Sequence, residues 1–143
     1  MDIRIRKIRN GDAGIISHLS KQLGYALSSV ETARQIKELV DSGDNCALVA
    51  FHDEKIIGWI HAFKALRLET KPFIEIGGLV IDENYRGKGI GKILVSKIKE
   101  WCIEQKISSL RVRCNTKRKE AHQFYFKNGF SETKEQKIFE LKI

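Results

Sequence analysis

Residues 86–91, which read RGKGIG, are the part of the sequence whose residue types and spacing most clearly predict chemistry. Glycines at every second position leave backbone N–H groups uncovered by side chains. A helix predicted to begin here directs its first N–H groups and the positive end of its dipole toward the loop. The loop therefore predicts a site for an anion such as a pyrophosphate. Its residues are Arg86, Gly87, Lys88, Gly89, Ile90, Gly91 and Lys92.

Two other phosphate-binding loops do not match this spacing. A Walker A loop has the form GxxxxGK[ST], but Arg86 stands at the position of its first glycine and Ile93 at the position of its hydroxyl residue. The dinucleotide fingerprint is GxGxxG, whereas the glycines here are spaced GxGxG. A plain tight turn into a helix is the remaining alternative, and the basic side chains around the glycines argue against it.

The predicted elements place this loop between a strand and a helix. Apolar runs predict strands at residues 2–8, 46–51, 56–63, 73–81 and 110–114, and two short final strands within 130–141. Helical spacing predicts helices at residues 12–22, 28–43, 90–102 and 117–128. Asp12 is the expected cap of the first helix, Ser28 and Glu31 have the spacing of a capping box on the second, and Gly129 should end the fourth. The order β-α-α-β-β-β-α-β-α-β-β predicts one α/β (α+β) domain over residues 1–143. Its sheet should be mixed, mostly antiparallel and twisted, with about six or seven strands flanked by about four helices.

A second motif lies downstream of the glycine loop. Asn115 ends a predicted strand, and residues 121–130, AHQFYFKNGF, have the form A-x-x-[FL]-Y-x-x-x-G-[FY]. Together with residues 79–91, LVIDENYRGKGIG, this motif resembles the paired signatures of the GNAT acetyltransferase superfamily, in the same order and at the same separation. The element order is similar to that family's fold over essentially the whole chain. The sequence departs from the family pattern at Glu83, where a proline is common.

The resemblance implies an acetyl-CoA-dependent N-acetyltransferase that acts on a primary amine of a small molecule or a protein, by direct attack in a ternary complex. Coenzyme A would lie between the fourth and fifth strands, with its pantetheine arm bonded like an added strand to the backbone of Leu79, Val80 and Ile81. The glycines at 77–78 agree with this, because glycines within a strand often mark a bulge. Asn115 would bond to the cofactor arm or the active-site backbone, and an ordinary strand-ending asparagine is the alternative.

Amine acetylation also needs proton transfers and donors for the oxyanion. Tyr125 is the predicted donor to the departing sulfur, because the resemblance places it there and a tyrosine, with an ordinary pKa of about 10, stays protonated. A core tyrosine is the alternative. Glu75 is the weaker candidate for general base, and a carboxylate paired with a nearby cation is its alternative. The resemblance alone assigns the oxyanion to backbone N–H groups near Val80 and Ile81. His61 and His122 are each a possible base or substrate contact, although a lone histidine in a strand or helix is more often structural or solvated.

The net charge of +8 is compatible with a phosphorylated ligand, nucleic acid or a membrane surface. Basic residues cluster best at the glycine loop and do not interleave with aromatics, so we expect acetyl-CoA and an amine as partners, and neither nucleic acid nor membrane. Three cysteines without metal-binding spacing predict a reducing, cytoplasmic setting and no metal. A non-catalytic acyl-CoA-binding regulatory module on the same fold is the alternative function. Residues 137–143 are a candidate edge strand for a homodimer.

Overall fold

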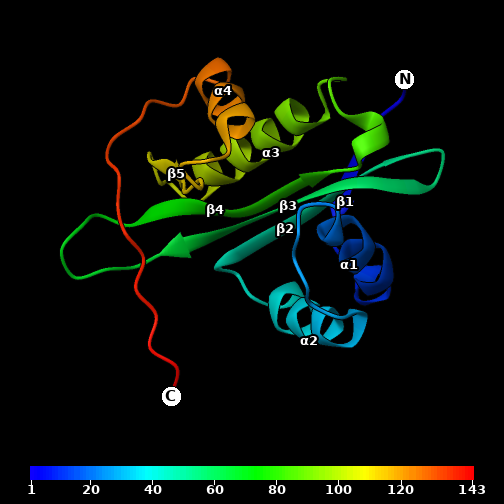
Figure 1. Cartoon of the computed structure of the whole chain (residues 1–143), viewed down its shortest axis with the longest axis horizontal. Coiled ribbons are helices and arrows are strands. Elements are labelled where there is room, and N and C mark those ends of the chain that lie inside the picture. Colours follow the sequence, from blue (N-terminus) through cyan, green and yellow to red (C-terminus); the bar gives the residue numbers. More distant parts are fainter. The chain divides into compact units, whose positions relative to one another are not determined.

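The computed structural model describes residues 1–143, which divide into two compact units, Met1–Arg113 and Cys114–Ile143. The first unit holds the β-sheet and helices α1 to α3, and the second holds α4 and the C-terminal segment (Figure 1). None of the helices combines the length and hydrophobicity that a membrane span requires.

The first unit is built on a five-stranded sheet with the strand order β1-β2-β3-β4-β5. Its first four strands pair antiparallel, and β4 and β5 pair parallel, as predicted for a strand–helix–strand crossover. The β2–β3 hairpin turns at Asp53 and Glu54, which both have positive φ, as a two-residue hairpin requires. The strands are β1 (Arg4–Lys7), β2 (Asn45–His52), β3 (Lys55–Ala65), β4 (Phe73–Ile81) and β5 (Leu110–Val112).

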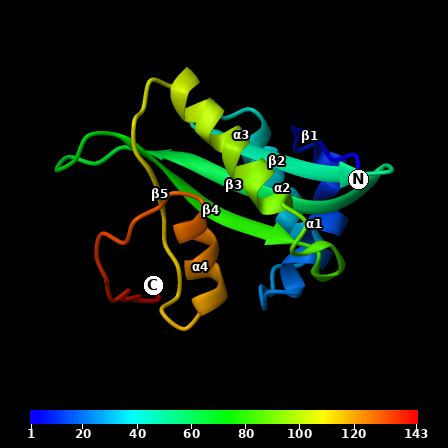
Figure 2. The ribbon, with the colours of Figure 1, turned by 90° about the horizontal axis from the view of Figure 1, so that it is seen from above.

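Helices cover both faces of this sheet. Figures 1 and 2 show α1 (Ala13–Lys21) and α2 (Ser29–Val40) on one face and α3 (Ile90–Glu104) on the other. The core beneath α1 and α2 gathers apolar side chains from both layers, because each amphipathic helix must bury its apolar stripe. Its buried members are Ala13, Ile16, Leu19, Ile36, Val49, Ile56 and Val80.

The two N-terminal helices begin in different ways. The predicted capping box of α2 is present, because Ser28 Oγ accepts from the N–H of Glu31 at 3.1 Å and Glu31 Oε1 accepts from the N–H of Ser28 at 3.3 Å. The predicted cap of α1 is wrong, since Asp12 does not bond to the first turn of that helix. Its carboxylate instead binds Arg6 through two bonds of 2.8 and 2.9 Å and the N–H of Arg9 at 2.8 Å.

The second unit contains α4 (Lys119–Lys127) and ends in an exposed segment without strands. Gly129 follows the helix with a φ of +89°, as predicted for its end. The two strands predicted within residues 130–141 are absent, so the sheet has five strands rather than six or seven. Alternation of Phe139, Leu141 and Ile143 is typical of a strand, but a strand also needs backbone hydrogen bonds to a neighbour, and the backbone of this segment makes none.

Candidate active site

Strand β4 contains a β-bulge at its glycine pair, as the sequence predicts. Along the ladder with β3, His61 pairs with Gly78 and Ala62 pairs with Ile76, so Gly77 has no partner. Glycine at 78 is required by the packing, because a Cβ there would lie 2.6 Å from a ring carbon of Trp59. The bulge bends the strand and increases its local twist.

Beyond the bulge, β4 has an open edge. Its parallel pairing with β5 ends at Ile76 and Val112, whereas β4 continues to Ile81. The side of residues 77–81 that faces away from β3 therefore has no strand neighbour within the first unit. Main-chain groups on such an edge can bind an extended ligand arm as an added strand. The predicted cofactor-binding residues on this stretch are Leu79, Val80 and Ile81.

The glycine loop connects this open edge to the N-terminus of α3. Gly87 and Gly89 have φ values of +76° and +81°, a conformation that favours glycine. The first helical hydrogen bond is donated by Ile93 to the carbonyl of Gly89 at 3.2 Å, and Gly89 provides no side-chain cap. The N–H groups of the first helical turn therefore face outward without a backbone acceptor, as an anion site needs.

Basic side chains surround the glycine loop. Arg86 folds back on the strand, where its Nε donates to the carbonyl of Ile81 at 3.1 Å. Lys88 is exposed, with its Nζ 5.9 Å from the centre of the Tyr85 ring, and Lys92 is exposed on the first turn of α3. The first unit thus brings together all the predicted anion-binding residues, and full positive charges add to the helix dipole there.

Glu75 lies on β4, one residue before the last paired position with β5. Its Oε1 accepts from Arg113 Nε at 3.2 Å, and its side chain is 13% exposed, compared with 51% for the arginine. This is the ion-paired arrangement that the sequence left open as the alternative to a base. A role of Glu75 in proton transfer remains a prediction.

Tyr125 and Asn115 belong to the second unit. The Tyr125 ring contacts Phe124 and Phe130 edge-on, with centroid distances of 5.1 and 5.2 Å, so it is held within an aromatic cluster. Asn115 Oδ1 accepts from the N–H of Lys117 at 2.9 Å, which closes the turn before α4. Both residues therefore have a local structural role, and their roles toward the cofactor remain predictions.

The contacts of His61 could not be predicted from the sequence. Its Nε2 lies 2.8 Å from Asn45 Oδ1, and burial lowers the pKa of the ring. The sequence places His61 in a strand, but only the register shift brings it beside Gly77. Two adjacent glycines in a strand indicate that a bulge is favoured. They do not indicate which residue of the neighbouring strand lies opposite it.

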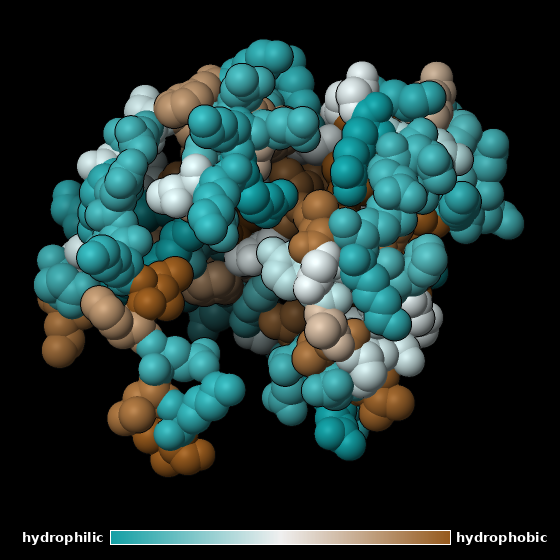
Figure 3. Space-filling view, viewed as in Figure 1, coloured by the Kyte–Doolittle hydropathy of each residue, from teal (hydrophilic) through white to brown (hydrophobic).

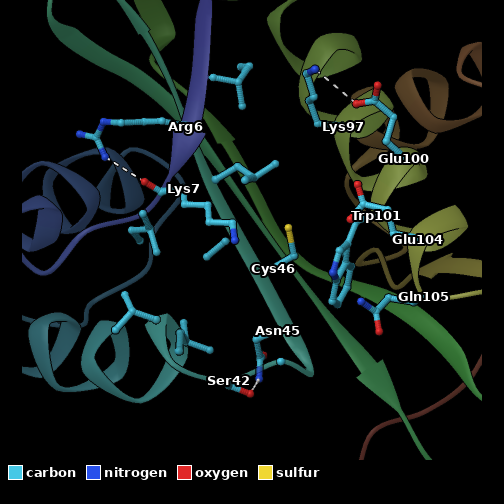
Figure 4. Close-up of a pocket in the computed structure, with 17 residues that line it drawn as sticks. Arg6, Lys7, Ser42, Asn45, Cys46, Lys97, Glu100, Trp101, Glu104 and Gln105 are labelled. Atoms are coloured by element: carbon cyan, nitrogen blue, oxygen red, sulfur yellow. Dashed lines mark hydrogen bonds and ion pairs between the residues drawn. The ribbon is translucent and has the colours of Figure 1, made fainter.

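A cavity of the first unit lies away from the predicted site. It has a volume of about 640 Å3 and runs along β1, the start of β2 and the C-terminal half of α3, where Trp101 and Glu104 line it (Figure 4). None of the predicted site residues lines this cavity. The chain also has no group of three or more His, Cys, Asp or Glu side chains arranged to hold a metal ion.

Residues 14–130 match the sequence model of the Acetyltransferase (GNAT) family. The chain belongs to this family. Streptothricin acetyltransferase of Escherichia coli is a relative of this GNAT chain, 28% identical over 118 residues that cover 80% of the chain and 65% of the relative. The chain therefore spans less than two thirds of that protein's length.

Solved structures show the same GNAT fold. Aminoglycoside 6'-N-acetyltransferase AAC(6')-Ih from Acinetobacter baumannii matches with a TM-score of 0.87 at 19% identity, over 99% of each chain. AAC(6')-Iy, solved with the bisubstrate analogue CoA-S-monomethyl-acetylneamine, matches with a TM-score of 0.88 at 16% identity, over 100% of each chain. At these identities the likeness establishes the fold of this GNAT protein.

Proposed function

We propose that this protein is an acetyl-CoA-dependent N-acetyltransferase that transfers the acetyl group to a primary amine by direct attack in a ternary complex. The observation that carries the proposal is the open edge of β4, which begins at a bulge and ends at the glycine-rich N-terminus of α3. A nucleotide thioester has two features that fit this arrangement, namely an extended amide-containing arm and a pyrophosphate. Membership of the GNAT family supports the same conclusion.

Each part of acetyl-CoA has a proposed partner. The pantetheine amides bond to the backbone at Leu79, Val80 and Ile81, because an open strand edge offers N–H and C=O groups in alternation. The pyrophosphate binds the first N–H groups of α3 and the basic side chains of residues 86–92. Asn115 is proposed as a further contact to the arm.

The proposed chemistry needs three groups besides the reactants. Backbone N–H groups near Val80 and Ile81 stabilise the tetrahedral oxyanion. The Tyr125 hydroxyl gives its proton to the departing thiolate. Glu75 is the candidate base from the sequence, although its carboxylate is shared with Arg113.

The acceptor is proposed as a primary amine, and the relatives' names supply the first compounds to test. Streptothricin and the aminoglycoside neamine are amine-bearing compounds named for two proteins similar to this chain. A panel containing both, together with a polyamine and a lysine peptide, covers small-molecule and protein acceptors. Release of coenzyme A thiol, followed with a colorimetric thiol reagent, detects turnover of any of them.

The same assay separates an enzyme from a non-catalytic acyl-CoA-binding module. Thiol release with one panel amine, with Arg86→Ala raising the KM for acetyl-CoA, supports the proposed enzyme. Tight binding of acetyl-CoA without thiol release for any amine would instead favour the regulatory module. An Arg86→Ala variant with an unchanged KM would remove the loop from cofactor binding.

A homodimer through residues 137–143 and a cytoplasmic location are also proposed. Figure 3 shows apolar side chains standing out from the C-terminal segment, and Ile138, Phe139, Leu141 and Ile143 are each more than four-fifths exposed. An exposed apolar segment with unpaired backbone is suited to pairing with another strand. Light scattering should give the mass of a dimer for the full chain and of a monomer after removal of residues 137–143.

The proposed cytoplasmic location is supported by the three free cysteines, because free thiols are typical of a reducing compartment.

A further inference from the structure

His61 lies on β3 directly beside the bulge in β4. It faces the same side of the sheet as Trp59, which packs against the core beneath α1 and α2. In the other direction along β3 its neighbour on that face is Phe63, whose ring centroid is 5.9 Å from that of the imidazole. The half-buried ring thus lies between the core beneath α1 and α2 and the bulge in β4.

The imidazole is held through its Nε2 atom. Asn45 Oδ1 lies 2.8 Å from Nε2. The same amide donates from its Nδ2 to Ser42 Oγ at 2.9 Å, the bond drawn between these two residues in Figure 4. Because the amide nitrogen is engaged by the serine, the amide oxygen faces the ring, and an amide oxygen only accepts hydrogen bonds. Nε2 of His61 therefore carries the proton, and Nδ1 keeps a lone pair.

The lone pair on Nδ1 is directed toward the bulge. A Cβ built on Gly77 would lie 3.2 Å from Nδ1 and 3.3 Å from Cε1 of Phe63, so the imidazole fills space that a side chain at position 77 would need. No protein group hydrogen-bonds Nδ1. A proton acceptor without a partner therefore lies next to the unpaired peptide where the open edge of β4 begins.

We propose that His61 is a catalytic base for acetyl transfer, in which Nδ1 accepts the proton of the acceptor ammonium. Asn45 and Ser42 are positioning residues that hold the tautomer with the proton on Nε2. The inference rests on the proposed acetyltransferase activity and adds a residue to it. Glu75 is a less suitable acceptor, because its Oε1 already receives a hydrogen bond from Arg113.

The proton balance of the step is complete with His61 in this role. Nδ1 takes one proton from the ammonium and later releases it to solvent. The freed nitrogen lone pair forms the C–N bond at the thioester carbonyl, and collapse of the tetrahedral intermediate breaks the C–S bond. The amide nitrogen loses its second proton to solvent, the sulfur gains one proton from Tyr125, and Tyr125 regains a proton from solvent. The net change is one amide, one thiol and one proton released.

The surroundings keep the ring neutral at pH 7. Burial lowers the pKa of His61 below its ordinary value of 6.5, and no neighbouring charge contributes to this shift. On the same face, Glu75 of β4 binds Arg113, the residue after β5. β5 contributes Arg111, whose guanidinium carbon lies 3.9 Å from the centre of the Phe73 ring. β2 contributes the uncharged Asn45 beside the ring. The side chains that α1 and α2 bury are apolar or uncharged, and they include Ile16, Leu19 and Ile36 with Ser17, Ser20 and Thr32.

The tautomer can be tested without any acceptor. Histidine labelled with 15N in the full chain reports protonation of each ring nitrogen, and His61→Asn identifies the resonances. We expect Nδ1 unprotonated and Nε2 protonated at neutral pH, with the ring titrating below 6.5. A proton on Nδ1, or titration above the ordinary pKa, would overturn the proposal.

Kinetics test the role itself, with the panel amine that the wild type acetylates. His61→Asn should lower kcat about 100-fold at pH 7, with an unchanged KM for acetyl-CoA. The loss should shrink as the pH rises, because more of the amine then arrives already deprotonated. His18→Asn, on the exposed face of α1, is the matched control and should keep the wild-type rate. An equal loss at every pH, or none, would contradict a base.

Two further variants keep the test decisive. His61→Gln replaces the Asn variant if thermal melts show that the latter unfolds, and it should show the same loss. Asn45→Asp places a carboxylate at Nε2, which should raise the pKa of His61 and move the acidic limb of the pH–rate profile upward. An unmoved acidic limb would exclude His61 as the titrating base.

Failure of the proposed function and failure of this inference have different results. If the wild type does not bind acetyl-CoA at all, the proposed function fails. If the wild type acetylates the amine but His61→Asn is fully active, only this inference fails.

Discussion

Replacing Gly89 by alanine perturbs the glycine loop with a cost that can be worked out from the structure. Gly89 has a φ of +81°, and nothing lies within 4 Å of a Cβ added there. The cost is therefore backbone strain alone, which for a left-handed residue with a side chain is roughly 1–2 kcal/mol. For a chain of this length, each kcal/mol shifts Tm by about 4 °C, so Gly89→Ala should lower Tm by roughly 4–8 °C.

Gly14→Ala is the matched control for this prediction. Gly14 lies in α1, and a Cβ there also meets nothing within 4 Å, but its backbone is helical. Alanine in a helix is favoured over glycine by about 0.5–1 kcal/mol, so this variant should raise Tm by roughly 2–4 °C. Calorimetric melts of both variants measure the two shifts. An unchanged Tm for Gly89→Ala, with the control behaving as expected, would refute the left-handed turn.

Binding of acetyl-CoA to the same two variants separates fold from function. At 25 °C both remain folded, and Gly89→Ala should bind acetyl-CoA more weakly because the methyl group stands among the N–H groups that receive the phosphates. Gly14→Ala should bind as the wild type does. Full affinity in a destabilised Gly89→Ala variant would mean that the loop is only a turn.

Three other predictions follow from the described contacts. Tyr125→Phe should keep acetyl-CoA affinity and lower kcat about 100-fold in the thiol-release assay; full activity would place the acid elsewhere. Burial raises the pKa of Asp12, but hydrogen bonds from Arg6 and Arg9 outweigh it and lower the pKa below 3.8. The contribution of this contact to the free energy of unfolding is therefore complete above that pKa and is lost as the pH falls through the lower pKa of the folded state. In urea titrations at acidic pH, the free energy of unfolding should fall with falling pH in the wild type, and Asp12→Asn should lack this fall. Burial raises the pKa of the Cys46 thiol to about 11, so iodoacetamide should label it slowly at neutral pH until the protein unfolds.

Local features of the fold were predictable from the sequence. The capping box at Ser28, the turn glycine at Gly129 and the glycine loop each depend on residues within a few positions of one another, and all three are present. The bulge at Gly77 was also predicted, because two adjacent glycines within an apolar strand are typical of a bulge. The cofactor-binding stretch of the candidate site follows from these local signals.

Features that depend on distant partners were not predictable. Asp12 was expected to cap α1, but Arg6 competes for the carboxylate once β1 lies beside it. Two short strands were expected within residues 130–141, but the backbone of this segment makes no hydrogen bonds to a neighbouring strand. His61 gained its place beside Gly77 only from a register shift between two strands, which periodicity alone does not specify.

Titration calorimetry with acetyl-CoA is the most direct test of the proposed cofactor site, with ATP as the control for a generic anion site. The open edge of β4 should recognise the pantetheine arm, which ATP lacks, while both ligands offer phosphates to the loop. We expect micromolar binding of acetyl-CoA and much weaker binding of ATP. No binding of acetyl-CoA, or binding equal to that of ATP, would contradict the proposed site.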